Sequence, residues 1–205
     1  MTPPGDYVRA VLWDMDGTLM SSQPLWDESF RRRCEQRGGS VTDEQVVSIA
    51  GASIARTCEI IAATGATDSP HDPATTELFA LIAADVANAV RTEPPIVPGA
   101  PRITSMLAEI GLAQVIVPQS PRRIVESVAH ALGDVFVELV TGDDGLPGKP
   151  TPAPYAAAIE RLGLSPEECV VVEDSATGAA SARSNDLRVI QVGGRTKLFP
   201  GDPGL

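Results

Sequence analysis

The feature that most constrains the fold is a series of short apolar runs, rich in β-forming residues, that recur along the chain. They lie at residues 8–13, 115–117, 136–140, 169–172 and 189–192, and from about residue 98 onward helix-length segments separate them. Continuous apolar runs without polar alternation are typical of parallel strands that are buried on both faces. The pattern therefore predicts an α/β fold in which helices cover both faces of a parallel sheet.

Two of the intervening helices have recognisable starts. The pairs Ser120-Pro121 and Thr151-Pro152 each place a hydroxyl side chain before a proline that suits the first helical turn. We expect both hydroxyls to cap the helices that follow.

A long segment without strand-like runs follows the first predicted strand. Within it, apolar residues recur at helical spacing in residues 50–63 and 78–90. The prolines at 94–95 and the Pro98-Gly99 pair interrupt this pattern before the strands resume. The sequence thus predicts a helical cap domain at residues 20–93, inserted into a core domain formed by residues 1–19 and 94–205.

Composition narrows the classes of partner. The formal net charge is −11, and the longest basic run, at residues 31–33, is typical of a solvated helix face. Nucleic acid and anionic membranes are therefore not expected as partners. No apolar run approaches the roughly 20 residues that span a bilayer. The three cysteines have no CxxC spacing, which suits a reducing compartment, so we expect a cytoplasmic protein.

Polar residues gather directly after the predicted strands, where parallel sheets collect their reactive groups. Carboxylates converging there would repel one another without a divalent cation, and their oxygen atoms are ligands that Mg²⁺ prefers. One carboxylate of a close pair can attack a phosphoryl group while the other transfers protons. The residues at these positions are Asp14, Asp16, Gln119, Ser120, Lys149, Glu173 and Asp174.

Several motifs resemble those of the haloacid dehalogenase superfamily, in particular its helical-cap subgroup of sugar-phosphate and phosphoglycolate phosphatases and β-phosphoglucomutases. The resemblance covers nearly the whole chain and implies a Rossmann-like three-layer parallel sheet core with an inserted helical cap. The motifs are Asp14-Met15-Asp16-Gly17-Thr18, Val97-Pro98-Gly99, Thr141-Gly142-Asp143-Asp144, Gly148-Lys149-Pro150 and Glu173-Asp174-Ser175-Ala176-Thr177-Gly178.

This resemblance implies a role for each matching residue. Asp14 corresponds to the nucleophile, and Asp16 to the general acid/base, whose backbone carbonyl also binds the metal. Lys149 corresponds to the lysine that holds the phosphoryl oxygens. Together with Asp14 and Asp16, Glu173 and Asp174 are expected to bind Mg²⁺. The implied reaction is hydrolysis of a small phosphate monoester, of the sugar-phosphate or phosphoglycolate type, through an aspartyl phosphate.

Five residues are expected to contact the phosphorylated substrate. Thr18, Gln119 and Ser120 belong to the core, whereas Ser53 and Arg56 lie in a segment that resembles the substrate-reading loop of the cap. The two cap residues have an equally good alternative interpretation. In it, Ser53 caps a helix and Arg56 is solvated.

Two departures from the family pattern leave alternatives open. Pro118 stands where the family has a Ser or Thr that binds the phosphoryl group, so a weakly active or inactive relative that binds a phosphorylated ligand is one alternative. A phosphosugar mutase is the other, but Trp26 stands near the position of the mutases' cap histidine, which favours hydrolysis. The sequence leaves the identity of the phosphate monoester and the oligomeric state undecided.

Overall fold

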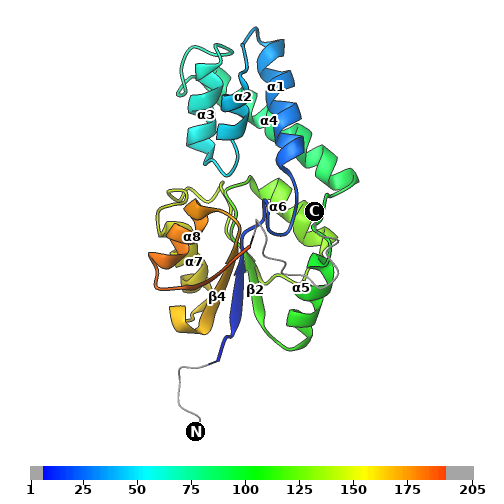
Figure 1. Cartoon of the computed structure of the whole chain (residues 1–205), viewed down its shortest axis with the longest axis vertical. Helices are drawn as coiled ribbons and strands as arrows, with labels where there is room; N and C mark the ends of the chain where they lie inside the picture. Colours follow the sequence, from blue (N-terminus) through cyan, green and yellow to red (C-terminus); the bar gives the residue numbers. More distant parts are fainter. Residues whose placement is uncertain (1–6, 193–205) are drawn as a thin grey trace.

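A computed structural model describes residues 7–192 of the chain, and the remaining parts of the predicted core domain, 1–6 and 193–205, lie outside the described residues. The described residues form five strands and eight α-helices. Five consecutive helices lie between β1 and β2, and from there on helices and strands alternate; Figure 1 shows their arrangement. In chain order the elements are β1 (Ala10–Trp13), α1 (Gln23–Gln36), α2 (Asp43–Ser48), α3 (Ile54–Ala63), α4 (Pro73–Thr92), α5 (Ala100–Glu109), β2 (Ala113–Ile116), α6 (Arg122–Ala131), β3 (Glu138–Leu139), α7 (Ala153–Leu162), the 3₁₀ turn η1 (Pro166–Glu168), β4 (Cys169–Glu173), α8 (Ala176–Arg183) and β5 (Arg188–Gln191).

The five strands form one parallel sheet in the order β3-β2-β1-β4-β5. Each apolar run that the sequence identified overlaps one of these strands, so the prediction of a parallel α/β sheet is confirmed. From β1 the chain adds β2 and β3 on one side of the sheet and then β4 and β5 on the other side, so the strand order changes direction at β1. Ligands of open α/β sheets bind at such a switch point, beyond the carboxyl ends of the strands.

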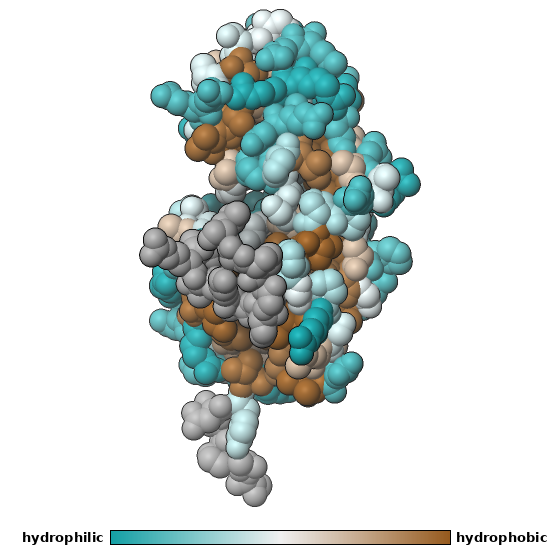
Figure 2. Space-filling view, turned by 45° about the vertical axis from the view of Figure 1, so that its right-hand side comes forward, coloured by the Kyte–Doolittle hydropathy of each residue, from teal (hydrophilic) through white to brown (hydrophobic). Residues whose placement is uncertain are grey.

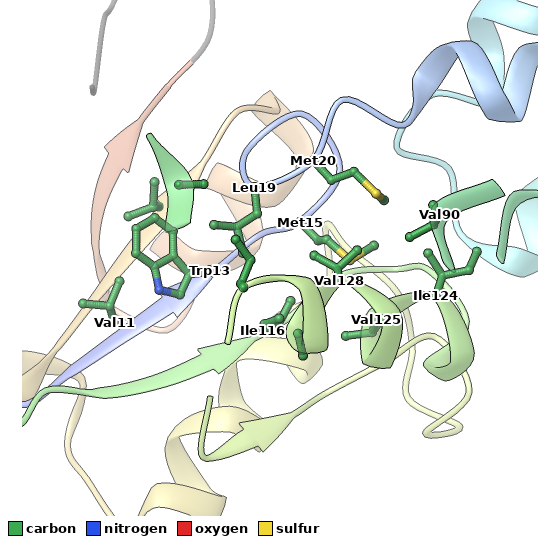
Figure 3. Packing of buried hydrophobic residues seen from close by; sticks show 14 of the residues in the cluster. Val11, Trp13, Met15, Leu19, Met20, Val90, Ile116, Ile124, Val125 and Val128 are labelled. Atoms are coloured by element: carbon green, nitrogen blue, oxygen red, sulfur yellow. The ribbon is translucent and has the colours of Figure 1, made fainter. Parts of the chain in front are cut away.

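The central strand β1 is buried on both faces because alternate residues enter two separate hydrophobic clusters. Val11 and Trp13 pack with α5 and α6 on one face, whereas Ala10 and Leu12 pack with α7 and α8 on the other. Figure 3 shows the first of these clusters, with Trp13 among the packed side chains. The result is the three-layer, Rossmann-like core that was expected.

Helices α1 to α4 form a separate group above the sheet in Figure 1, and we call this group the helical part and the remainder the α/β part. The sequence predicted two helices here; the structure has these as α3 and α4, together with α1 and α2. A third hydrophobic cluster fills the space between the four helices. Hydrophilic side chains cover much of the outer surface of the helical part on the face shown in Figure 2.

The basic run at the end of α1 is used within the helical part. Arg33 makes two hydrogen bonds of 2.7 Å to Asp85 of α4, and Arg32 and Ser29 reach the same carboxylate. These contacts join α1 to α4 and hold the pKa of Asp85 below its usual value, chiefly through Arg33. The run therefore braces two helices and does not form a phosphate-binding patch.

The two connections between the parts lie side by side. The backbone N–H of Ser21 donates to Pro95 at 2.8 Å, and the N–H of Val97 donates to Leu19 at 2.9 Å. Apolar packing also crosses the junction, since Val90 of α4 and Ile124 of α6 belong to one cluster and lie close together in Figure 3.

Among residues 7–192, no helix is long and apolar enough to cross a bilayer.

The predicted hydroxyl caps are wrong. In α6 and α7 the proline itself occupies the N-cap position, so the preceding hydroxyl is one residue too far from the helix. Ser120 donates to Asp16, and Thr151 donates to the carbonyl of Pro147 at 2.9 Å. The first turn of α6 is instead satisfied by the Asp143 carboxylate, which accepts from the N–H of Arg122 at 2.7 Å.

Candidate active site

The loops at the carboxyl edge of the sheet bring together the charged residues that the sequence singled out. Asp14 directly follows β1, and Glu173 and Asp174 stand at the end of β4. Lys149 comes from the loop before α7. These four residues line one cavity together with Asp16.

Lys149 is buried between two carboxylates. Its Nζ lies 2.8 Å from Asp14 Oδ1 and 2.6 Å from Glu173 Oε1, and it also lies 4.9 Å from the centre of the Tyr155 ring. Burial disfavours the ammonium form, but attraction to Asp14, Tyr155 and Glu173 prevails, so the pKa of Lys149 is raised well above its usual value. Lys149 therefore carries a fixed positive charge beside Asp14.

Glu173 is fully enclosed and has its partners in place. Its second carboxylate oxygen accepts from the N–H of Ser175 at 2.8 Å and from the Ser175 hydroxyl at 3.0 Å, at the start of α8. Glu173 thus connects the first turn of α8 to Lys149 and fixes the position of the ammonium beside Asp14.

Asp14, Glu173 and Asp174 are the carboxylates that could together hold a cation, as predicted from the sequence. Asp14 Oδ2 is buried and has no hydrogen-bond partner among the described residues. One carboxylate oxygen each from Asp14, Glu173 and Asp174 lie within 4.8 Å of one another. Gly17 leaves the space that the Asp174 carboxylate fills, because a Cβ at this position would overlap Asp174 Oδ2.

The protonation equilibria of Asp14 and Asp174 also indicate a site built for a cation. Burial raises the pKa of Asp14 to about 7, against the opposing effect of Lys149. Burial and the neighbouring Glu173 raise the pKa of Asp174 to about 6. Both shifts reflect anions that are poorly compensated, and a bound Mg²⁺ would relieve them. The donor set, consisting entirely of oxygen atoms, fits this ion.

Asp16 is oriented by two serine side chains from two parts of the molecule. Ser120 of the loop after β2 donates to Asp16 Oδ2 at 2.6 Å, and Ser22 donates to Oδ1. Burial raises the pKa of Asp16, while hydrogen bonds from Ser120, Ser22 and Trp26 oppose the increase. A carboxyl group held in one orientation is suited to exchange a proton with a bound ligand.

The cavity itself has a volume of about 380 Å³ and lies at the junction of the two parts. This size falls within the range of about 300–1,000 Å³ that is usual for small-molecule sites. Its floor is the acidic edge of the sheet. Its opposite wall comes from the helical part and includes Trp26, Ile49, Ala50, Gly51, Ala52, Ile54, Thr57 and Phe79.

In the loop after β2, Pro118 provides no hydrogen-bond donor, whereas the next two residues each have a backbone N–H that could bind an anion. Pro118 is buried and has no N–H or hydroxyl to offer. Within residues 7–192, the N–H groups of Gln119 and Ser120 donate to no backbone carbonyl. Both residues line the cavity, so their N–H groups remain available to an anion.

Three of the predicted substrate contacts do not lie on the cavity wall. Ser53 accepts from the N–H of Arg56 at 3.2 Å as the N-cap of α3, and the Arg56 side chain pairs with Glu59 at 2.6 Å. This is the alternative interpretation given above for the two residues. Thr18 is buried behind the loop, where its hydroxyl has no partner among the described residues. None of the three lines the cavity.

Sequence reasoning missed Ser22 and Tyr155 and considered Trp26 only as a replaced histidine. Ser22 lies on the hinge, and Trp26 packs against Phe79 of α4 with ring centres 6.4 Å apart. Tyr155, in α7, places its hydroxyl 3.4 Å from Glu173. For Ser22, its hydroxyl group and its place next to the predicted hinge were the available signal. No sequence pattern indicated the contacts that Trp26 and Tyr155 make.

Comparison with known proteins identifies the class that this fold and site define. The family model of haloacid dehalogenase-like hydrolases matches residues 8–186, and the chain belongs to this family. It is 26% identical over 198 residues to hexitol phosphatase B of Escherichia coli, which covers 90% of this chain and 83% of the relative. It is 28% identical over 189 residues to phosphoglycolate phosphatase of Rhodospirillum rubrum, covering 89% of this chain and 78% of the relative.

Solved structures share the fold. CbbY from Rhodobacter sphaeroides, determined in complex with phosphate, superposes with a TM-score of 0.78 at 22% identity, covering 96% of this chain and 92% of that one. The β-phosphoglucomutase of Clostridium difficile gives a TM-score of 0.78 at 17% identity, with 91% and 85% covered. At these identities the similarity is one of fold.

Proposed function

We propose that this chain is a Mg²⁺-dependent phosphatase that hydrolyses a small phosphorylated metabolite through an aspartyl phosphate on Asp14. The observation that carries the proposal is the state of the Asp14 carboxylate. Its Oδ1 lies 2.8 Å from Lys149, while Oδ2 has no partner in the part of the chain that the structure describes. A carboxylate held in this way is suited to attack a phosphoryl group. The phosphatase names of two relatives support the same class.

In the first step an Asp14 oxygen forms a bond to phosphorus, and the bond from phosphorus to the leaving oxygen breaks. Asp16 gives its proton to that oxygen, which leaves as an alcohol. In the second step Asp16 takes a proton from water, which attacks phosphorus, and inorganic phosphate leaves as the Asp14 carboxylate is restored. Asp16 can serve in both directions because Ser22 and Ser120 keep its carboxyl group oriented.

Other groups of the site stabilise charge. Lys149 holds its ammonium at the phosphoryl oxygens, and the free N–H groups of Gln119 and Ser120 take the place of the donor that Pro118 lacks. Asp14, Glu173, Asp174 and the Asp16 carbonyl would hold Mg²⁺, which would supply Lewis-acid neutralisation of the phosphoryl charge. We further propose that residues 20–93 form a cap that shields the phosphorylated Asp14 from bulk water.

Hydrolysis is favoured over a mutase reaction by the position of Trp26. The indole N–H is a donor that exchanges no proton with substrate at neutral pH, and it lies at the cavity wall beside Asp16. Among the described residues, neither histidine lines the cavity. A sugar hydroxyl therefore has no additional base to activate it for rephosphorylation.

The decisive experiment is phosphate release from a panel of sugar phosphates and phosphoglycolate, with and without Mg²⁺. We expect release to require Mg²⁺ and to fall at least about 10³-fold in Asp14→Asn, since no other group can form the covalent intermediate. Asp68→Asn, the same substitution at an exposed position, serves as the control. Equal rates for wild type and Asp14→Asn would refute the mechanism.

A further inference from the structure

The wall of the cavity that faces Asp14 is uncharged. It consists of side chains from α1, the loop before α3, α3 itself and α4, and most of them are apolar. The largest are Trp26 and Phe79, whose rings stack on each other. A leaving group attached to a phosphate at Asp14 extends toward this wall, because the carboxyl edge of the sheet forms the other side of the cavity.

All arginines of the helical part except Arg91 pair with carboxylates of the same part. Arg33 pairs with Asp85, Arg37 with Glu77, and Arg56 with Glu59. Of the lysines and arginines within residues 7–192, Lys149 alone lines the cavity. Its ammonium is already shared between Asp14 and Glu173. No second described cation remains for another anionic group of a substrate.

The negative charge at the sheet edge of the cavity further disfavours a second anionic group on the substrate. Four carboxylates line the cavity, those of Asp14, Asp16, Glu173 and Asp174, and the phosphoryl group itself adds negative charge. A further carboxylate or phosphate on the leaving group would lose water against the apolar wall and be repelled by the floor. A hydroxylated carbon skeleton has neither cost, and its C–H face can pack on the Trp26 ring.

The geometry points to a substrate class: phosphate monoesters whose leaving group is uncharged and offers an apolar face, to the exclusion of those with a second anionic group. This inference rests on the proposed phosphatase function and specifies the substrate for it. The wall is held in place by Gln119, whose amide donates to the carbonyl of Gly51 at 2.6 Å. The discrimination is thus built into the contact between the helical and α/β parts.

Matched substrate pairs test the inference with the wild-type protein. Glycerol 3-phosphate and 3-phosphoglycerate share a three-carbon skeleton, and the second has a carboxylate where the first has a hydroxymethyl group. Glucose 6-phosphate and glucose 1,6-bisphosphate form a second pair. We expect kcat/KM to be at least about tenfold higher for the member of each pair whose leaving group is uncharged. This difference corresponds to the cost of an unpaired anionic group in a poorly hydrated site.

A charge-insertion variant provides the second measurement. Ala52→Lys places an ammonium on the cavity wall, and we expect it to reduce the preference for the neutral member at least about fivefold. Val47→Lys adds the same charge at a position of the helical part that is 73% exposed and should leave the preference unchanged. Equal or higher kcat/KM for the anionic members with the wild type would overturn the inference and leave the phosphatase function standing. No phosphate release from any substrate would instead refute the proposed function.

Discussion

At the scale of single residues, the charge state of the site depends on how tightly Glu173 is enclosed. Its carboxylate lies between Lys149 and the first turn of α8, and Gly178 in that turn packs directly against it. A Cβ at position 178 would overlap the Glu173 carboxylate. A glycine inside a helix is usually a weakness, but here it makes room for the group that positions Lys149.

Gly178→Ala therefore should destabilise the protein, although alanine is favoured over glycine in helices by about 1 kcal/mol. We expect a lower Tm and a fall in kcat of about 10²-fold, because displacement of Glu173 removes a partner of Lys149. Thr177→Ala, at the exposed neighbouring position, should keep full activity. Thermal unfolding and phosphate release measure both effects, and an unchanged Gly178→Ala variant would contradict this account.

The charged residues could be placed from the sequence, whereas their hydrogen-bond partners could not. Asp14 and Asp174 follow strands of a parallel sheet, so topology alone brings them to one edge. Ser22 and Trp26 reach Asp16 only because the helical part sits above that edge, and the sequence does not encode this placement locally. The local pattern around Ser53 indicates an N-cap, which the structure has. It does not tell where the helical part places this residue relative to the sheet edge, so a substrate contact was an equal alternative.

At the scale of elements, several polar contacts and one apolar cluster join the helical part to the α/β part, and two of the polar contacts lie away from the hinge. Gln119 donates to Gly51 in the loop before α3, and Arg123 of α6 donates to the carbonyl of Ala80 in α4 at 2.7 Å. The apolar cluster includes Val90 and Ile124. The Gln119 contact is the one that fixes the cavity wall.

Gln119→Ala should loosen that wall. We expect faster amide hydrogen exchange in residues 49–53 and a rise in KM that exceeds the change in kcat, because the side chain positions the wall and takes no part in bond breaking. Gln36→Ala, at an exposed position of α1, is the control. Unchanged exchange and KM would show that the Gln119 hydrogen bond does not hold the loop.

The strands were the most predictable elements, and the helix starts the least. Buried parallel strands leave a continuous apolar run, such as residues 169–172 of β4, that few other structures produce. Helices α1 and α2 escaped prediction, although Thr42 and Gln45 form a complete capping box at the start of α2. The pairs Ser120-Pro121 and Thr151-Pro152 led to wrong N-cap predictions, because a proline can occupy either the N-cap or the first helical position.

At the scale of the whole molecule, the centre carries a concentration of negative charge that folding must hold together. Asp14, Asp16, Glu173 and Asp174 converge from segments far apart in the chain, and Lys149 is the only described cation among them. Such a cluster destabilises the folded state unless a cation is bound, and an ion that binds only the folded chain stabilises it in proportion to its occupancy.

Mg²⁺ should therefore raise the Tm independently of any substrate. At 100 times the dissociation constant, binding contributes about 2.7 kcal/mol, and for a chain of this size that corresponds to roughly 5–10 °C. We expect EDTA to remove the increase and Asp174→Asn to abolish it, whereas Asp68→Asn should retain it. An equal increase in Asp174→Asn would place the ion elsewhere.

The position of Ser22 links proton transfer to the arrangement of the two parts. Ser22 and Trp26 lie beyond the hinge contact of Ser21 with Pro95, so they belong with the helical part, while their partner Asp16 belongs with the sheet. A rotation about the hinge would separate the acid from the Ser22 hydroxyl, one of its two side-chain donors. Leaving-group protonation would then be synchronised with closure, so that the open molecule could admit an ester without a correctly aimed proton to cleave it.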